Sequence, residues 1–507
     1  MAANGNLLDE SLTRTRRNSS ARQVMFAPRS SRFLVRRRAI VRDCGRSRRT
    51  GPLSRITGAS ILTTLAVSAV AGGFAPPARA AKGVLTSNIA APPTALAPGP
   101  GNAATTLRIS QLEKSVESSP ANGQMWLQLS SAYLRRAFET SDPAFYPLAA
   151  RSVDKAGKLI GDSPEVLAVK AGLALTRHRF GDARSLSVQL LQQRPTSFSG
   201  RIELFDANVE LGRYGEAFAA IDELVDLRPN VATLSRLSYA RQLRGDLVGA
   251  EAAMREAVSA AAAGSFDRAV ALGYLGDVLL EGGRLNAAGR AYDEAVAIAT
   301  VPTAVLGQAR VALARGKPEL AASAVDALTA RIPLPGALGF RADIARSTGD
   351  TAAATDADQL VDASVALFRA NGAVVDAELA VILADRGRGA ATEAVATARR
   401  AYGERKTIFT ADALAWALLV SGRSREALPF AIEAVQTAPS VASVRWHAGA
   451  VFAALGDVAR ARAELQAAVR NPWFSPTQRP ALEAMATRMG VALIAEPNQP
   501  IAAANRP

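Results

Sequence analysis

The stretch G-R-L-N-A-A-G-R-A-Y-D-E-A, at Gly283–Ala295, contains the pattern that decides the fold. A glycine and a charged residue open it, and Ala288, Tyr292 and Ala295 follow at the i, i+4, i+7 spacing of one buried helix face. The glycine can adopt the left-handed backbone conformation that ends one helix and lets the chain turn into the next. The stretch therefore predicts the junction between two antiparallel helices.

The same junction recurs along the chain at spacings of 33 to 38 residues. Each junction has a glycine followed by Arg, Asp or Lys, and in most of them an alanine follows five residues after the glycine. The glycines are Gly212, Gly245, Gly283, Gly316, Gly349, Gly387, Gly422 and Gly456. An alanine at this place lets two helices approach closely. A fixed period of this length predicts a stack of helix pairs.

Helix pairs near 34 residues long, with small residues at set places and a proline at the end of several units, resemble tetratricopeptide repeats (TPRs). The first-helix signature W-x2-L-x3-Y appears at Trp126, Leu129 and Tyr133, and a Leu-Gly pair appears at Leu275-Gly276. The resemblance covers residues 107–490. It implies an all-α fold, a TPR-like α-solenoid that forms a right-handed superhelix of antiparallel helix pairs.

Ten units are expected, with an extra helix covering each end of the stack because end repeats otherwise expose their core. The end helices are expected at 107–118 and 477–489. The units are expected to begin near residues 123, 164, 198, 231, 269, 302, 335, 374, 408 and 442. The seventh unit matches least well, because Asp358 stands where an apolar residue is expected.

The last two repeats resemble a narrower group. A-D-A-L-A-W-A-L (411–418), W-H-A-G (446–449) and N-P-W-F-S-P (471–476) resemble the C-terminal segment of exported bacterial TPR proteins. This resemblance implies a location outside the cytoplasm, in the periplasm or secreted, and it implies no biochemical activity.

The N-terminal region predicts export independently. Residues 1–55 form a basic leader with 14 Arg against three acidic residues, and residues 56–80 contain an uncharged stretch followed by an A-x-A site. This order predicts a secretory signal peptide cut between Ala80 and Ala81. Two alternatives stay open: residues 56–75 are about long enough to remain as a membrane anchor, and the Arg- and Ser-rich start resembles an organelle transit peptide.

Residues 81–106 are rich in Ala, Pro and Gly and are expected to be a flexible spacer, and residues 491–507 a disordered tail. Most of the net charge of +15 belongs to the leader, because residues 82–507 hold 45 basic and 42 acidic residues. No basic stripe with interleaved aromatic residues remains, so nucleic acid is not expected as a partner. Contact with a membrane is expected only through an uncleaved leader.

The TPR resemblance implies a protein–protein interaction scaffold or adaptor of the cell envelope, binding a partner protein or peptide in a concave groove lined by first helices. Trp and Tyr would be flat anchors there, and charged residues would be selective contacts. The implied groove residues are Tyr239, Gln242, Asp277, Glu281, Arg310, Asp343, Arg346, Asp412, Trp416 and Trp446. For Trp416 and Trp446, packing between helices is the open alternative.

No catalytic, cofactor-binding or metal site is predicted, and the protein is not expected to be an enzyme. The single cysteine, Cys44, lies in the leader, so the mature chain has no thiol chemistry. His178 stands where other units have the turn glycine and is expected to be exposed. His447 has no acidic residue four positions away and is expected to be packed or on the surface.

Two other functions stay open. One is a structural or assembly solenoid without a peptide ligand, which would show self-association. The other, more distant, is a helical-toroid enzyme that processes glycans; it would need Asp, Glu and aromatic residues clustered on the loops between helices. The short, glycine-ended connections argue against the second.

Overall fold

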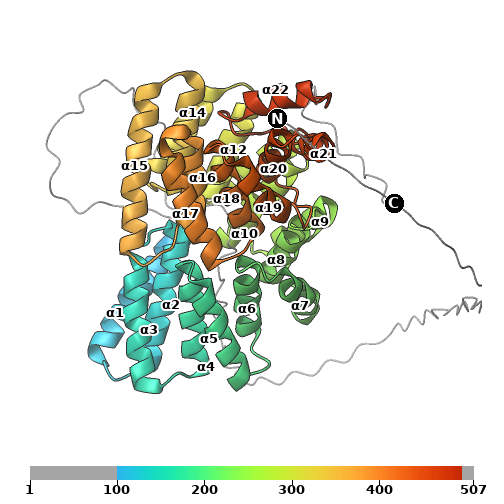
Figure 1. The fold of residues 1–507 in the computed structure, drawn as a ribbon. Coiled ribbons are helices and arrows are strands. Elements are labelled where there is room, and N and C mark those ends of the chain that lie inside the picture. The colour runs from blue at the N-terminus through green and yellow to red at the C-terminus, as the bar shows by residue number, and fades with distance from the viewer. Residues whose placement is uncertain (1–99, 494–507) are drawn as a thin grey trace, which may run out of the picture. The chain divides into compact units, whose positions relative to one another are not determined.

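The computed structural model describes residues 100–493, which contain twenty-two α-helices, one short 3-10 helix and no strand. Between α1 (Pro100–Ser118) and α22 (Arg479–Arg488), the helices form ten consecutive antiparallel pairs, called units 1 to 10 here (Figure 1). The predicted all-α solenoid is confirmed. The predicted leader, signal peptide and cleavage site between Ala80 and Ala81 lie outside the described residues.

Eight of the ten first helices begin at the expected residue, and α10 and α16 begin within three residues of it. The first helices are α2 (Gly123–Thr140), α4 (Pro164–Thr176), α6 (Phe198–Glu210), α8 (Val231–Gln242), α10 (Phe266–Glu281), α12 (Pro302–Ala314), α14 (Pro335–Thr348), α16 (Asp376–Asp385), α18 (Ile408–Val420) and α20 (Ala442–Ala454). The second helices are α3 (Phe145–Ile160), α5 (Phe180–Gln193), α7 (Tyr214–Leu227), α9 (Leu247–Ala260), α11 (Leu285–Ile298), α13 (Pro318–Thr329), α15 (Thr351–Ala370), α17 (Ala391–Glu404), α19 (Ser424–Ala434) and α21 (Val458–Ala468), with the 3-10 helix η1 (Arg388–Ala390) before α17.

The first end helix is longer than expected. It begins at Pro100, so the expectation of a flexible spacer reaching residue 106 is wrong for its last residues. The reason is that proline fits the first turn of a helix, where its missing N–H has no partner to lose. After Gly101, the sequence as far as Ser118 contains no further glycine or proline.

The turn glycines adopt the predicted conformation. All eight have φ between +69° and +87°, and His178, in the same place of unit 2, has φ +59° and is exposed. The prediction that His178 is an exposed turn residue is confirmed. The alanines five residues after these glycines are buried, as close helix packing requires.

Tyr292 shows why the Leu275-Gly276 pair matters. The ring of Tyr292, on α11, is fully buried between Gly276 of α10 and Gly307 of α12. A Cβ atom on either glycine would lie 2.3 Å from the ring. The two glycines therefore leave the space that the aromatic ring of the second helix fills.

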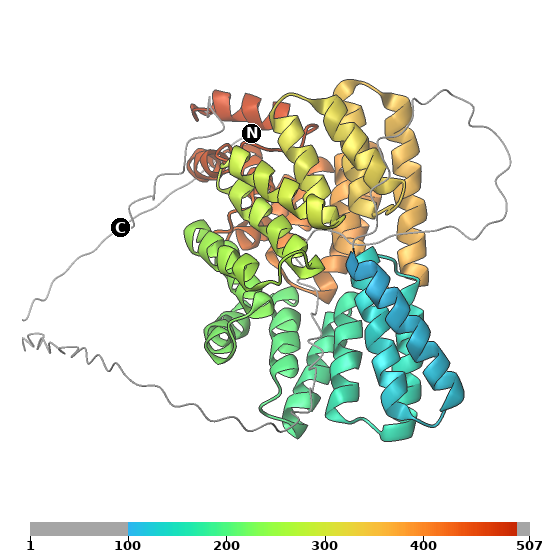
Figure 2. The ribbon, with the colours of Figure 1, turned by 180° about the vertical axis from the view of Figure 1, so that it is seen from behind.

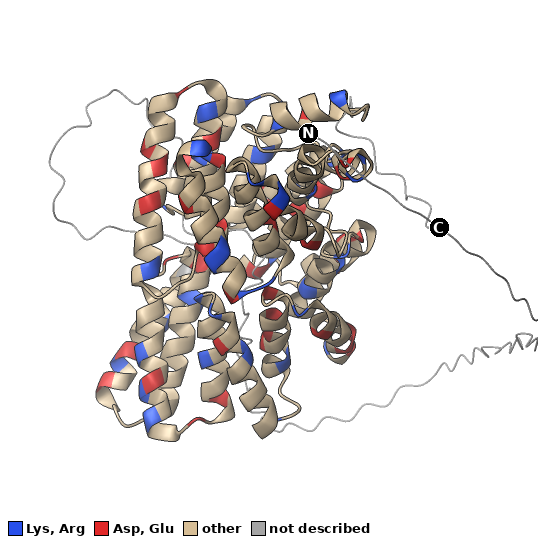
Figure 3. Cartoon of the chain, viewed as in Figure 1, with Lys and Arg blue, Asp and Glu red and all other residues tan. Residues whose placement is uncertain are grey.

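First and second helices differ in how far they are enclosed. The first helix α18 buries nine of its thirteen residues, so it is covered on all sides, whereas α19 buries only Ala427, Ala431 and Ala434 along one stripe. The second helices therefore form the outer layer. Figure 3 shows acidic and basic residues interspersed over the described helices. None of these helices is both long and apolar enough to cross a membrane.

The stack curves until its later units meet its earlier ones, which Figures 1 and 2 show where the orange helix α17 comes beside the teal helices. We call this contact the seam. The Val374 N–H donates to the Arg177 carbonyl (3.0 Å), and the Ile408 N–H donates to the Tyr214 hydroxyl (3.0 Å). The Arg405 guanidinium pairs with the Glu210 carboxylate (2.7 Å). These seam contacts join residues 194 to 197 positions apart.

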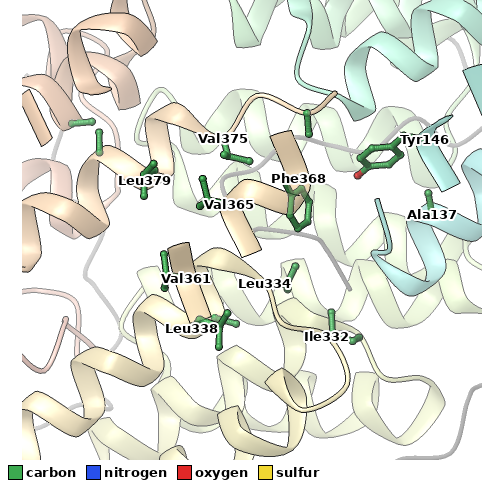
Figure 4. Close-up of a cluster of buried hydrophobic side chains, with 14 of the residues drawn as sticks. Ala137, Tyr146, Ile332, Leu334, Leu338, Val361, Val365, Phe368, Val375 and Leu379 are labelled. Atoms are coloured by element: carbon green, nitrogen blue, oxygen red, sulfur yellow. The ribbon is translucent and has the colours of Figure 1, made fainter. Parts of the chain in front are cut away.

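An apolar cluster extends the contact between distant units. Phe368 of α15 lies next to Tyr146 of α3, and Val365 and Val375 continue the cluster toward unit 8 (Figure 4). All of these side chains are buried. Units 1, 7 and 8 therefore share one hydrophobic core although they are far apart in the sequence.

Candidate functional site

The ten implied groove residues all lie on first helices, as the repeat register predicted. Tyr239 and Gln242 are on α8, Asp277 and Glu281 on α10, Arg310 on α12, Asp343 and Arg346 on α14, Asp412 and Trp416 on α18, and Trp446 on α20. The structure brings them together in groups that are bonded within the chain. Whether any of them binds a partner stays a prediction.

The first group lies beside the seam. The Gln242 side-chain amide donates to the Glu281 carboxylate (3.2 Å), and the Ser440 hydroxyl donates to the same carboxylate (2.8 Å). Burial raises the pKa of Glu281 to about 7, although these two hydrogen bonds act in the opposite direction. Tyr239, one turn earlier on α8, is 5% exposed, so an exposed groove position is wrong for it.

The second group is an ion pair between neighbouring units. The Arg310 guanidinium lies 3.2 Å from the Asp277 carboxylate, which also accepts a hydrogen bond from the Tyr292 hydroxyl (2.8 Å). The Arg310 and Asp277 side chains are 25% and 16% exposed. The pair is therefore fixed in place and still partly open to solvent.

The third group explains the poor match of unit 7. Arg346 pairs with Asp343 (3.2 Å) and with Asp358, and Arg386 pairs with Asp358 from the next unit (3.0 Å). A carboxylate is tolerated at 358 because two arginines neutralise it. Burial, followed by the nearby Asp385 charge, raises the pKa of Asp343 to about 8.

The fourth group surrounds His447, which is 1% exposed. Its Nδ1 lies 2.9 Å from the Asp412 carboxylate, and its Nε2 lies 3.1 Å from the side-chain oxygen of Gln478. The Gln478 amide donates to Asp385 (2.7 Å), and so does the Trp416 indole (2.8 Å). The rings of Trp416 and His447 stack with centroids 4.2 Å apart.

Two implied groove residues of this group are enclosed. Asp412 is 5% exposed and hydrogen-bonds to the buried His447 ring. Trp446 is 2% exposed and packs edge-on against Phe474. An exposed groove position is wrong for both, and packing between helices is the outcome for Trp446. The acidic partner of His447 was missed because it stands one repeat earlier in the chain, 35 residues away.

We expect His447 to stabilise the fold most at low pH. Burial lowers its pKa, but the Asp412 and Asp385 charges and the hydrogen bonds to Asp412 and Gln478 outweigh this and raise it above the ordinary value of 6.5. A raised pKa means that the contribution is complete below pH 6.5 and is lost as pH rises through the folded-state pKa. His447→Asn should therefore lower the free energy of unfolding by about 1–3 kcal/mol at pH 6 and by less at pH 9. Urea unfolding at both pH values measures this, and an equal loss at both would contradict a charged ring.

A further ionic cluster on α6 was missed by the sequence analysis. Arg236 of α8, 1% exposed, binds both carboxylate oxygens of Asp206 (2.6 and 2.5 Å). Neither carboxylate oxygen of the fully buried Glu203 has a hydrogen-bond partner among the described residues. The signal was present, because Glu203, Asp206 and Glu210 stand at i, i+3 and i+7, which places three carboxylates on one helix face.

Comparisons with known proteins bear on the repeat. A family model described as tetratricopeptide repeat matches residues 306–366 and 413–476, which span most of units 6, 7, 9 and 10. No curated protein matches the sequence. Within residues 100–493, no group of three or more His, Cys, Asp or Glu residues could hold a metal ion.

Several solved structures are similar to this chain. A thermophilic TPR protein of Thermus thermophilus is 20% identical, with 36% of this chain and 99% of that chain covered and a TM-score of 0.32. A TPR protein of Parabacteroides merdae is 17% identical, with coverages of 53% and 98% and a TM-score of 0.30. The human IFIT1 dimer with PPP-AAAA is 13% identical, with coverages of 73% and 88% and a TM-score of 0.43. The matched repeat model and the ten helix pairs with glycine turns show that this chain contains tetratricopeptide repeats within a TPR-like α-solenoid.

Proposed function

We propose that this protein is an exported scaffold that binds a partner protein or peptide through the first helices of its middle units. The observation that carries the proposal is the presence of two partly exposed ion pairs, Asp277–Arg310 and Asp343–Arg346, on α10, α12 and α14. Their side chains are 15% to 25% exposed, in units whose other first-helix residues are mostly buried. They therefore offer charge at fixed positions.

The Arg310 guanidinium can bind a second carboxylate. Its Nη1 bonds to Asp277, and a guanidinium carries five N–H donors. A carboxylate of a partner can therefore bind the partly exposed Arg310 alongside Asp277. The planar guanidinium suits this role, since it binds a carboxylate through two parallel hydrogen bonds.

The cellular location is part of the proposal. The order of basic leader, uncharged stretch and small residues around Ala80 supports export, and a chain without cysteine after cleavage suits an oxidising compartment. We place the protein in the periplasm or outside the cell, as an adaptor of the envelope.

Crosslinking in the native envelope, followed by affinity capture and mass spectrometry, tests both parts. We expect a bait that begins at Ala81 and one reproducible partner. Arg310→Gln together with Arg346→Gln should reduce capture about tenfold, since truncating central charged contacts costs more than about 1 kcal/mol. Arg255→Gln is the control, because Arg255 forms its ion pair with Glu251 on a second helix.

The outcomes separate the proposal from its alternative. If the double variant Arg310→Gln with Arg346→Gln captures as much partner as the control Arg255→Gln, the first helices are excluded as the binding surface. The seam favours the second candidate, a structural solenoid, because it ties units 2–5 to units 8–10. Capture of the protein itself alone, with self-association on a sizing column, would support that candidate.

A further inference from the structure

The connection between α21 and α22 carries two aromatic residues that go to different places. The Arg310 guanidinium lies over the Trp473 ring, 5.1 Å from the centroid of that ring. The Trp473 ring also meets the Phe340 ring edge-on, with the two centroids 6.1 Å apart. Arg310 and Phe340 belong to the first helices of units 6 and 7. The next residue, Phe474, is 4% exposed and packs against Trp446 of unit 10. Two consecutive side chains therefore connect the last unit to the middle of the stack.

This connection is held at both ends. The side-chain oxygen of Asn471 accepts a hydrogen bond from the backbone N–H of Trp473 (3.0 Å). The Pro472 carbonyl accepts one from the Arg479 guanidinium (3.0 Å). At the other end, Gln478 bonds to Asp385 of α16 and to His447 of α20. We call residues 471–478 the strap. Through it, the chain covers one side of Arg310, a partly exposed charged residue proposed to contact a partner.

The site under Trp473 selects an aromatic ring. A guanidinium over a ring face attracts it through the charge distribution of the ring, and the edge-on neighbour Phe340 adds an aromatic contact. Trp473 also packs against the apolar core cluster of units 4 to 6. The site therefore binds a flat apolar ring in preference to other side chains.

Trp473 does not suit this site fully. Its indole Nε1 is buried, and no hydrogen-bond acceptor meets it within residues 100–493. A buried donor without a partner loses its hydrogen bonds to water and gains none in return. A phenylalanine ring in the same place would give up some ring area and the stronger cation–π attraction of Trp, but it would bury no unmatched donor, whose cost is about 1–3 kcal/mol. The strap is thus held less tightly than the site allows.

We propose that the strap is an intramolecular competitor for the partner site, and that the partner presents a segment with a phenylalanine that displaces Trp473 from Arg310 and Phe340. This inference rests on the proposed function, which it makes specific. The unmatched indole donor is what keeps the strap displaceable. Binding of the partner would release the link between unit 10 and units 6 and 7.

The test uses the full chain and a defined probe. The probe is a fluorescein-labelled synthetic peptide, R-N-P-F-F-S-P-T-Q-R, which follows residues 470–479 with Phe in place of Trp473. Fluorescence anisotropy should show at least tenfold tighter binding to Trp473→Ala than to the wild type, because the site is then empty. Trp473→Phe should shift binding in the opposite direction, to weaker than wild type, because the strap then competes better.

Two controls define the site. Trp473→Ala combined with Phe340→Ala should lose the gain, and Trp126→Ala should bind the probe like the wild type, because Trp126 lies in unit 1 and donates to the Pro120 carbonyl. A melting curve shows whether each variant is folded. The opposite directions expected for Ala and Phe cannot result from loss of folding, since unfolding would shift both alike.

Each outcome bears on the inference. Equal probe binding by wild type, Trp473→Ala and Trp473→Phe would overturn it. Dimerisation of Trp473→Phe through exchanged straps would also overturn it, by making a second copy of the chain the occupant. If envelope capture depends on Arg310 while the probe binds all variants equally, the strap inference fails and the proposed function stands. If the probe distinguishes the variants and no partner is captured, the proposed function is the one that fails.

Discussion

Gly212→Ala is expected to lower the free energy of unfolding by about 2–5 kcal/mol, whereas Gly316→Ala should lower it by about 1–2 kcal/mol. Both glycines hold the same turn position, with φ of +74° and +69°, so both variants carry the left-handed strain of about 1–2 kcal/mol. Only Gly212 lies at the seam, where an added Cβ atom would be 1.8 Å from the Lys406 carbonyl oxygen. No described atom lies within 4 Å of the position at Gly316.

Urea unfolding of the two variants measures this difference. Gly245→Ala is a third point, because its Cβ atom would lie 2.5 Å from the Ala438 carbonyl oxygen, a less severe clash. The expected order of stability is therefore Gly316→Ala, then Gly245→Ala, then Gly212→Ala. Amide hydrogen exchange at Ile408 should also accelerate in Gly212→Ala, because its N–H is bonded across the seam. Equal losses for all three would mean that the seam does not constrain the turns.

The same glycines show how far the sequence predicts the fold. A glycine, an alanine five residues later and an apolar stripe are local signals, so they located eight of the ten first helices at the right residue. The seam has no local signal. It results from a small rotation between neighbouring units that accumulates over about six repeats. Gly212 and Gly316 therefore look alike in the sequence and differ only in what the curved stack brings against them.

The candidate site was predicted to a similar extent. The repeat register placed all ten residues on first helices but did not predict which would be enclosed. Asp412 and Trp446 are buried because His447 and Phe474 reach them from the next unit and from the strap. Residue spacing within one helix does not indicate contacts with residues one repeat away or at the far end of the chain.

Arg236→Met is expected to cost about 3–5 kcal/mol at pH 8, because it leaves a buried carboxylate without its cation. Arg236 and Asp206 are 1% and 4% exposed and form two parallel hydrogen bonds. Glu203, also buried, stands beside them without a hydrogen-bond partner in the described part of the chain. The exposed pair Arg255–Glu251 is the control, where Arg255→Met should cost about 0–1 kcal/mol.

The loss should depend on pH in a direction that identifies its cause. Burial raises the pKa of Asp206 to about 6 and that of Glu203 well above its ordinary value, and the Arg236 charge lowers both. Without Arg236 both values rise further. A raised carboxyl pKa makes the fold less stable as pH increases from the unfolded-state pKa through the folded-state value. The gap between Arg236→Met and wild type should therefore widen from pH 5 to pH 8, as urea unfolding can show.

The double variant Arg236→Met with Asp206→Leu separates charge from packing. If the cost comes from an unpaired charge, removing Asp206 as well should recover most of the stability, since apolar residues of similar volume replace a buried ion pair at little cost. If the double variant is as unstable as Arg236→Met and the gap is the same at pH 5 and pH 8, the loss comes from the space that the long Arg236 side chain fills. The first outcome would mean that the ion pair between α6 and α8 fixes the register of units 3 and 4 without adding much to their stability, which is the role that a charge inside an apolar stack can serve.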